Sequence, residues 1–218
     1  MKVLCYDCFS GISGDMNLGA MIDLGIDILY LRSELGKLNL NGWELFAEKA
    51  QRHGITGTIV TVRQTVHEHT HRHLSDIEKI ISGSSLPEAV KQLSMKIFMK
   101  IATAEAAVHG IDIEEVHFHE VGAIDSIIDI VGAAICFNTL KVGTVIVSEV
   151  ELGGGFANCD HGKLPVPAPA TAEIIKGIPV RTGGVDFEAT TPTGAAILSV
   201  LGTEFGTVSH VKIEKTGY

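Results

Sequence analysis

The 218-residue sequence contains no long apolar run, and this absence excludes one class of protein. A helix that crosses a bilayer needs about 20 consecutive apolar residues, and no stretch approaches that length. The first residues, Met1 to Asp7, hold one lysine followed by a strand-like run, without the charged, apolar and cleavage regions of a signal peptide. We therefore expect a cytoplasmic protein that has no membrane partner.

An excess of basic residues is also missing. Lys and Arg number 17 against 26 Asp and Glu, which gives a formal net charge of −9. An acidic chain repels phosphate backbones, so binding to nucleic acid is not expected. Hydrophobic residues nevertheless make up 45% of the sequence, which is enough to bury a core and excludes a chain that is disordered throughout.

Cysteine is scarce, with four residues at positions 5, 8, 136 and 159. The Cys5-x-x-Cys8 spacing suits zinc or redox chemistry, but a structural zinc site would need a second pair of ligands at similar spacing, and none is present. Cys5 alternates with Val3 as in a strand, so we expect it to be buried. We interpret the cysteines as reduced structural thiols.

Helical and strand-like patterns alternate along the chain. Strands are expected at 2–7, 43–51, 55–66, 116–119, 144–150, 178–181 and 208–214. Helices are expected up to residue 24 and at 27–38, 75–82, 87–109, 125–140, 170–176 and 193–201, with Ser75 opening a capping box. This order predicts an α/β fold with a central sheet flanked by helices, with a mixed α+β arrangement as the alternative. A long Gly- and Pro-rich segment at 151–169 is expected to be a functional loop.

Histidine is the abundant exception, with ten residues, and most of them are clustered. His67, His69, His71 and His73 alternate along one segment. In an extended chain, alternate side chains point the same way, so the four imidazoles would line one face. Imidazole suits Ni²⁺, Zn²⁺ and Cu²⁺. The run predicts a metal site, and the alternative is a solvated loop that happens to contain histidines.

A second group of metal-ligating side chains follows in the middle of the sequence. It comprises His117, His119, Glu120, Asp125 and Asp129. The two histidines would share one side of a strand that Phe118 anchors from the other side. The two aspartates are one helical turn apart, and an apolar helix that keeps a carboxylate needs a partner for it. A metal would serve as that partner, and an ordinary buried His–Asp pair is the alternative.

Three glycine-rich segments suggest contact with an anion. Gly153, Gly154 and Gly155 permit positive φ and expose backbone N–H groups, and His161 follows as a candidate ligand. No Walker A motif and no GxGxxG fingerprint occurs. The other two segments each lead into a helix, where anions bind or a hydroxyl caps the helix. Their candidate residues are Asp7, Ser10, Gly11, Ser13, Gly14 and Asp15 in one, and Thr191, Thr193 and Gly194 in the other.

The same residues carry a family resemblance. The matching stretches are DCFSGISGDM at 7–16, RHLSDI at 72–77, HFHEVGA at 117–123, HGKLPVPAPAT at 161–171 and TPTGAA at 191–196. Their order and spacing along nearly the whole chain resemble the nickel-insertion proteins of the LarC family, which complete the nickel-pincer nucleotide cofactor.

This resemblance implies a nickel chelatase, a lyase, that inserts Ni²⁺ into a pyridinium bisthiocarboxylate mononucleotide and consumes CTP with Mn²⁺ or Mg²⁺. Family members usually continue into a second domain that binds CTP and drives oligomerisation, and some make the two parts as separate products. Residues 1–218 are therefore expected to be the N-terminal, metal-handling part, with the CTP-binding domain absent. The implied partners are the thiolated mononucleotide, that C-terminal part and further copies of the chain.

The residues themselves leave two other functions open. A zinc or manganese hydrolase could use His117, His119 and Asp125 to activate water. A non-catalytic nickel store or chaperone would need only the histidine run. In the nickel-insertion reading, the histidines bind Ni²⁺ in their neutral form, so nickel loading is expected to weaken below roughly pH 6.

Overall fold

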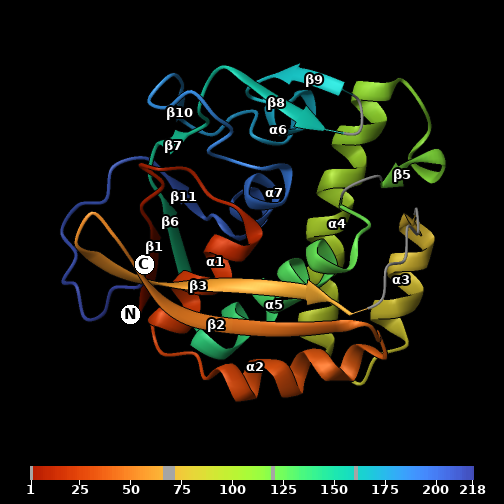
Figure 1. Cartoon of the computed structure of the whole chain (residues 1–218), viewed down its shortest axis with the longest axis horizontal. Helices are drawn as coiled ribbons and strands as arrows, with labels where there is room; N and C mark the ends of the chain where they lie inside the picture. The colour runs from red at the N-terminus through yellow and green to blue at the C-terminus, as the bar shows by residue number, and fades with distance from the viewer. Residues whose placement is uncertain (1, 66–71, 119–120, 160–161) are drawn as a thin grey trace. The chain divides into compact units, whose positions relative to one another are not determined.

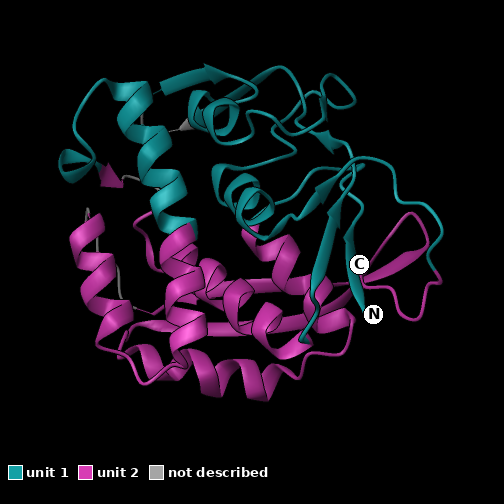
Figure 2. Cartoon of the chain, turned by 180° about the vertical axis from the view of Figure 1, so that it is seen from behind, with its two compact units in different colours: residues 1–13, 97–116, 141–211 teal, residues 14–96, 117–140, 212–218 magenta. Residues whose placement is uncertain are grey.

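The computed structural model describes residues 2–65, 72–118, 121–159 and 162–218 (Figure 1). It confirms the α/β class, since helices alternate with strands and a parallel sheet is present. The chain divides into two compact units (Figure 2). Unit 1 comprises residues 1–13, 97–116 and 141–211, and unit 2 comprises residues 14–96, 117–140 and 212–218.

Unit 1 is built on a three-stranded parallel sheet in the order β1-β6-β11. The strands are β1 (Val3–Tyr6), β6 (Thr144–Val147) and β11 (Glu204–Phe205). Val145 and Val147 of the central strand are 1% and 0% exposed, whereas their neighbours are half-buried, so one face of the strand forms core. Cys5 is exposed and Leu4 is buried, which makes the predicted burial of Cys5 wrong. The alternation is present, but its phase is opposite.

Two further strand pairs lie beyond the parallel sheet. They are β7 (Val150–Glu151) with β10 (Val180–Arg181), which is parallel, and β8 (Phe156–Cys159) with β9 (Gly162–Pro165), which is antiparallel. The segment expected to be a loop therefore contains a hairpin. Its strands, FANC and GKLP, have few of the β-branched residues that signal a strand, so their mutual pairing was not visible in the sequence.

The helices of unit 1 are those expected. They are α6 (Pro169–Ile174), α7 (Pro192–Leu201) and the second half of α4 (Glu88–His109), followed by the short 3₁₀ helix η2 (Ile113–Glu115). The strand predicted at 208–214 is wrong, because those residues form no regular element and most are exposed. An alternating pattern makes a strand only where another strand is available to pair with it.

Unit 2 contains a long β-hairpin covered by helices. The strands β2 (Trp43–Arg52) and β3 (Ile55–Gln64) pair along their full length, which confirms the predicted hairpin. His53 and Gly54 form its two-residue turn with φ of 50° and 83°, as a primed turn requires. The first half of α4 belongs to this unit, together with α1 (Gly14–Asp23), α2 (Ile28–Leu35), η1 (Gly36–Leu38), α3 (Leu74–Ser82) and α5 (Ile124–Leu140).

Close contacts position α1 between β3 and α5. A Cβ atom added to Gly19 would lie 2.2 Å from the carbonyl oxygen of Thr58, so only glycine lets the helix backbone meet the strand. On the α5 side, Gly132 leaves room for the Leu18 side chain, which is 0% exposed. Helix α5 is apolar and mostly buried, as predicted. In the described part of the chain, no helix combines the length and apolar character needed to cross a membrane.

The start of α3 differs from the prediction. Two short strands, β4 (Arg72–His73) and β5 (His117–Phe118), pair in front of it, and extended backbone continues to His73. His73 is therefore the N-cap, and its backbone N–H donates to Asp76 Oδ2 at 3.2 Å. The predicted cap at Ser75 is wrong because pairing of the two strands, which are far apart in sequence, sets where the helix begins.

We predict that alanine has opposite effects at two helical glycines. Gly19→Ala should lower the free energy of unfolding by about 1–3 kcal/mol, despite the better helix propensity of alanine, because its Cβ overlaps Thr58. Gly36→Ala should raise it by up to about 1 kcal/mol, since φ is −60° and nothing lies within 4 Å. Urea unfolding of both variants checks this, and equal effects would contradict it.

Candidate functional site

Two histidine-bearing segments meet in unit 2. Strands β4 and β5 pair antiparallel, with Arg72 opposite Phe118 and His73 opposite His117. The ring centroids of His73 and His117 are 3.9 Å apart, and the ring planes are tilted by 49°. Two stretches that are distant in the sequence thus place their imidazoles on the same side of a small ribbon.

The opposite side of this ribbon is its anchor. Arg72 and Phe118 are 8% and 2% exposed, and Arg72 Nη1 donates to the Gly122 carbonyl oxygen at 2.7 Å. The predicted anchoring by Phe118 is confirmed. Because successive residues of a strand face opposite ways, this anchor directs the two histidines to the other side. Nδ1 of His73 is buried and has no hydrogen-bond partner within the described chain.

The remaining histidines of the two predicted metal groups lie outside the described residues. These are His67, His69, His71 and His119, together with Glu120 and His161. Their contact with a metal stays a prediction. Among the residues that the structure does describe, no group of three or more His, Cys, Asp or Glu side chains is arranged to hold a metal ion.

A buried carboxyl group is the second feature of unit 2. Asp129 lies on α5, and its Oδ1 atom has no hydrogen-bond partner among the described residues. A Cβ added to Gly14 would lie 2.5 Å from Asp129 Oδ2, so the glycine at the start of α1 makes room for the carboxyl group. Burial, followed by the negative charges of Asp15 and Asp125, raises the pKa of Asp129 to about 8.

Asp129 is therefore protonated at neutral pH. The exposed carboxylates of Asp15 and Asp125 lie near enough to disfavour a negative charge on it. The three acids come from α1 and α5. A cation is the kind of ligand that would relieve both the burial and the repulsion. The sequence predicted a partner for Asp129, and the described part of the chain supplies none at Oδ1.

The glycine triplet of unit 1 uses its backbone donors internally. Gly153 N–H donates to Glu151 Oε1 at 2.8 Å, and Gly154 N–H donates to the Phe187 carbonyl oxygen at 3.2 Å. Gly155 follows with φ of 74° and is exposed. Two of the three N–H groups proposed for an anion are thus already bonded within the chain.

The other two glycine segments pack against each other in the same unit. A Cβ added to Gly11 would lie 2.0 Å from the Ala189 oxygen, and one added to Gly194 would lie 2.2 Å from the Ile12 oxygen. Thr191 caps α7 by accepting a hydrogen bond from Gly194 N–H at 3.2 Å. These residues therefore have structural roles, and the capping alternative for the second segment is realised.

The remaining anion candidates divide by exposure. Asp7 and Ser10 are exposed after the end of β1, Ser13 is half-buried, and Thr193 is 8% exposed inside α7. The anion contacts predicted for these residues stay predictions. Cys8 lies beside Asp7 and is 3% exposed, and burial, with the charge of Asp7, raises the pKa of its thiol to about 12. It is a protonated structural thiol, as predicted.

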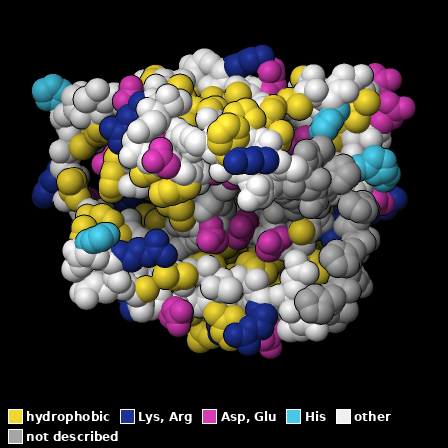
Figure 3. Space-filling view, turned by 45° about the horizontal axis from the view of Figure 1, so that its top comes forward, with side chains coloured by type: hydrophobic (Ala, Val, Ile, Leu, Met, Phe, Trp, Pro, Cys, Tyr) yellow, Lys and Arg dark blue, Asp and Glu magenta, His cyan; other side chains and the backbone are white. Residues whose placement is uncertain are grey.

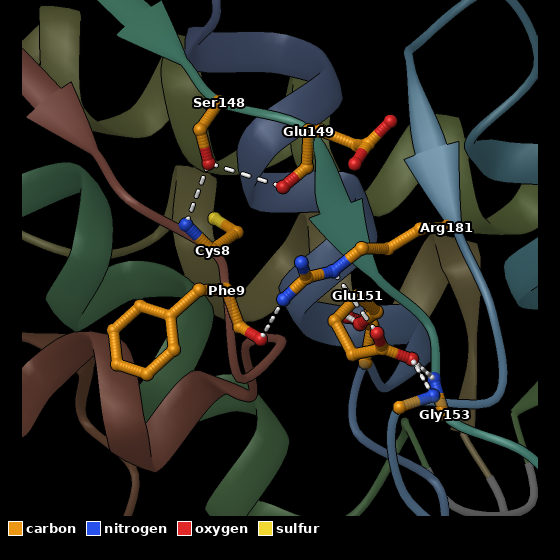
Figure 4. A network of polar contacts seen from close by, with 9 residues as sticks. Cys8, Phe9, Ser148, Glu149, Glu151, Gly153 and Arg181 are labelled. Carbon is orange, nitrogen blue, oxygen red and sulfur yellow. Dashed lines mark hydrogen bonds and ion pairs between the residues drawn. The ribbon is translucent and has the colours of Figure 1, made fainter.

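An ion pair between a buried glutamate and an exposed arginine lies near these segments and was not predicted from the sequence (Figure 4). Glu151 is 2% exposed, and its Oε2 atom lies 3.1 Å from Arg181 Nε. Parallel pairing of β7 with β10 places the two residues opposite each other. Glu151 Oε1 also accepts the N–H groups of Gly153 and Gly184. An acid flanked by Val150 and Leu152 was the signal that could have revealed it.

Arg181 extends this network to the turn after β1. Its Nη2 donates to the Phe9 carbonyl oxygen at 2.7 Å. Cys8 N–H donates to Ser148 Oγ at 2.8 Å, and Ser148 Oγ in turn donates to the Glu149 carbonyl oxygen at 3.1 Å. Figure 4 shows these groups around the ends of β1 and β6. The turn that carries Phe9 is therefore bonded on both sides.

Comparison with known proteins decides the family. The family described as "Nickel insertion protein" matches residues 4–218. The chain belongs to the nickel insertion protein family. The resemblance seen in the sequence motifs is thereby confirmed.

Several curated members of the nickel insertion protein family match the entire chain. A "Pyridinium-3,5-bisthiocarboxylic acid mononucleotide nickel insertion protein" of Clostridium kluyveri is 56% identical, with 100% of this chain and 58% of the relative covered. The protein of that name from Desulfitobacterium hafniense (strain DSM 10664 / DCB-2) is 49% identical, with 100% and 54% covered. A "Putative nickel insertion protein" of Wolinella succinogenes is 52% identical, with 100% and 56% covered.

The chain thus spans a little over half the length of these family members. No protein of known structure matches it.

We predict that Asp129→Asn stabilises this family member in a pH-dependent way. Folding raises the pKa of Asp129 from the ordinary value of 3.8 to about 8, so the folded state favours the protonated carboxyl group. The contribution of this group to stability is therefore fully present below pH 4 and is lost as the pH rises through 8. The variant should gain roughly 2 kcal/mol or more at pH 8 and very little at pH 4. Urea unfolding across pH checks this. Asp125→Asn, an exposed change on the same helix, should have a smaller effect at pH 8.

We predict that the contacts of the buried Glu151 carboxylate in unit 1 contribute strongly to stability. Glu151→Ala should lower the free energy of unfolding by about 2–4 kcal/mol, because Arg181 and two glycine N–H groups lose their partner. Glu173→Ala, which breaks the exposed pair with Lys176, should cost under about 0.5 kcal/mol. Thermal and urea unfolding compare the two variants, and similar losses would refute the distinction.

Proposed function

We propose that this chain takes part in inserting nickel into a pyridinium-3,5-bisthiocarboxylic acid mononucleotide, the reaction that the names of its relatives state. The observation that carries the proposal is the pairing of β4 with β5, which brings His73 and His117 together. Imidazole nitrogen is a good ligand for Ni²⁺. We infer that this ribbon is where the chain holds its nickel cargo, with cytoplasm as the setting.

The ribbon supplies two imidazoles, and the neighbouring sequence supplies more. His71 precedes His73 by two residues, His119 follows His117 by two, and we propose both as further ligands. His67, His69, Glu120 and His161 are proposed with them, as the sequence suggests. Neutral nitrogen ligands give up Ni²⁺ to thiocarboxylate sulfurs, which are softer donors, so the metal can pass to the substrate by ligand exchange.

The carboxyl groups of Asp15, Asp125 and Asp129 are proposed as a second place where the cation is favoured. Their mutual repulsion and the burial of Asp129 support this, because a divalent cation would replace the proton that Asp129 holds at neutral pH. CTP with Mn²⁺ or Mg²⁺ is proposed to act through sequence beyond the matched half of the relatives. Assembly of several copies is part of the same proposal.

The first test is nickel binding by the ribbon. Dialysed chain at pH 7.5 should bind at least one equivalent of Ni²⁺ in calorimetric titration. The double variant His73→Ala, His117→Ala should bind the tightest equivalent about tenfold or more weakly, since each lost ligand weakens the site. His53→Asn is the matched control, because that histidine lies exposed in the β2–β3 turn and asparagine tolerates its φ of 50°. Equal binding by all proteins would contradict the proposal.

The second test is the reaction itself. The chain is mixed with Ni²⁺, CTP and the thiolated mononucleotide, with and without the part of the Clostridium kluyveri relative that lies outside the match. Absorbance of the nickel product should appear in the complete mixture and fall in the His73→Ala, His117→Ala variant. Nickel binding without product in any mixture would favour a nickel store. Ester or amide hydrolysis without CTP would favour a hydrolase.

A further inference from the structure

Phe9 is an exposed aromatic ring on a fixed backbone. Its side chain is 60% exposed, and its position is directly after the carboxyl end of β1. Most phenylalanines of small domains lie inside, and an exposed one lacks the stabilisation that burial provides. In open parallel sheets, ligands bind outside the carboxyl ends of the strands. Phe9 is at that place in the sheet of unit 1.

The backbone of Phe9 is held from several directions. Arg181 Nη2 donates to its carbonyl oxygen, and the buried Glu151 carboxylate orients Arg181 through Nε. On the other side, Gly11 N–H donates to the Cys8 carbonyl oxygen at 3.0 Å and closes the turn. Figure 4 shows the Phe9 ring directed away from the ion pair while its carbonyl group faces Arg181. Because this backbone is held in place, less conformational entropy is lost when the ring binds a partner.

Two of the other exposed phenylalanines, Phe46 and Phe156, already have cationic partners. Lys163 Nζ lies 4.7 Å from the ring centroid of Phe156, and the Arg63 guanidinium lies 4.7 Å from that of Phe46. Hydrophobic side chains also stand beside Lys and Arg side chains on the face drawn in Figure 3. Within the residues that the structure describes, no cation lies over the ring of Phe9. Its π face is therefore open to a cationic ligand.

We propose that Phe9 is the stacking platform for the positively charged pyridinium ring of the mononucleotide substrate. The identity of that ring rests on the proposed function. A planar cation stacks on a phenyl ring through both dispersion and the ring quadrupole, and the neutral reduced form of the same ring keeps only the dispersion. Phe9 would thus hold the ring by its face and leave its substituents at the edge accessible to nickel.

The probe for this site is nicotinamide mononucleotide, which carries a pyridinium ring without sulfur. Its reduced form, whose ring is uncharged, is the matched ligand. Binding of both to the intact chain is measured by calorimetry or by NMR titration at millimolar ligand. The wild type should prefer the oxidised form. Phe9→Ala should bind that form about 5- to 30-fold more weakly and lose the preference. Phe9→Trp should restore it.

Phe156→Ala is the matched control, because that ring is 62% exposed and its cation is already supplied by Lys163. This variant should bind the oxidised probe like the wild type. Both alanine variants should melt like the wild type, since neither ring is buried. Phe9→Ala with unchanged affinity and preference would overturn the proposal. So would a wild type that fails to bind the oxidised probe, or a Phe156→Ala variant that loses as much affinity.

Nickel titration of the same proteins separates this inference from the proposed function. Phe9→Ala should retain its nickel equivalent, because the ring has no part in the histidine ribbon. Intact nickel binding and product formation by Phe9→Ala would overturn the stacking site alone and leave the proposed function standing. Loss of nickel binding in the His73→Ala, His117→Ala variant, with probe binding retained, would support two separate sites.

Discussion

Glu151 is enclosed between apolar strand residues, and its charge is balanced by Arg181. A carboxylate in such a place must be paired and hydrogen-bonded, because removing it from water is costly. Parallel pairing of β7 with β10 provides the pair, and the glycine N–H groups satisfy the other oxygen. The arginine then reaches the Phe9 carbonyl oxygen. The buried carboxylate therefore contacts the glycine segment directly and the turn after β1 through Arg181.

Two buried polar groups of unit 2 lack the hydrogen bonds that Glu151 has in unit 1. Asp129 Oδ1 and His73 Nδ1 are both buried without hydrogen-bond partners in the described chain. Such groups are uncommon in native proteins and each lowers stability, so their presence calls for a ligand, a water or a functional role. An imidazole nitrogen without a hydrogen-bond partner and a buried carboxyl group are both groups that can bind a metal ion. In unit 1, by contrast, the buried carboxylate of Glu151 is paired with Arg181 and hydrogen-bonded to two glycine N–H groups.

The helices and the β2–β3 turn could be predicted because their signals are local. The apolar residues of α5 and the His53-Gly54 pair are each visible within a few positions of the sequence. The errors concern strands, whose formation depends on whether a second strand is available to pair with them. The β8–β9 hairpin has weak strand propensity but a partner, and residues 208–214 have strand-like alternation but none. Strand pairing thus overrode propensity in both directions.

The sequence by itself determined the family, the α/β class and the two histidine segments, because motifs and periodicity are properties of consecutive residues. Only the tertiary structure decided that His73 faces His117, that Asp129 is buried beside Gly14, and that Glu151 pairs with Arg181. It also decided that two of the three glycine N–H groups predicted to bind an anion, those of Gly153 and Gly154, are used within the chain. The reason is physical. Burial, hydrogen bonding and charge pairing depend on which atoms meet in space. Atoms from distant parts of the sequence meet only when the chain folds.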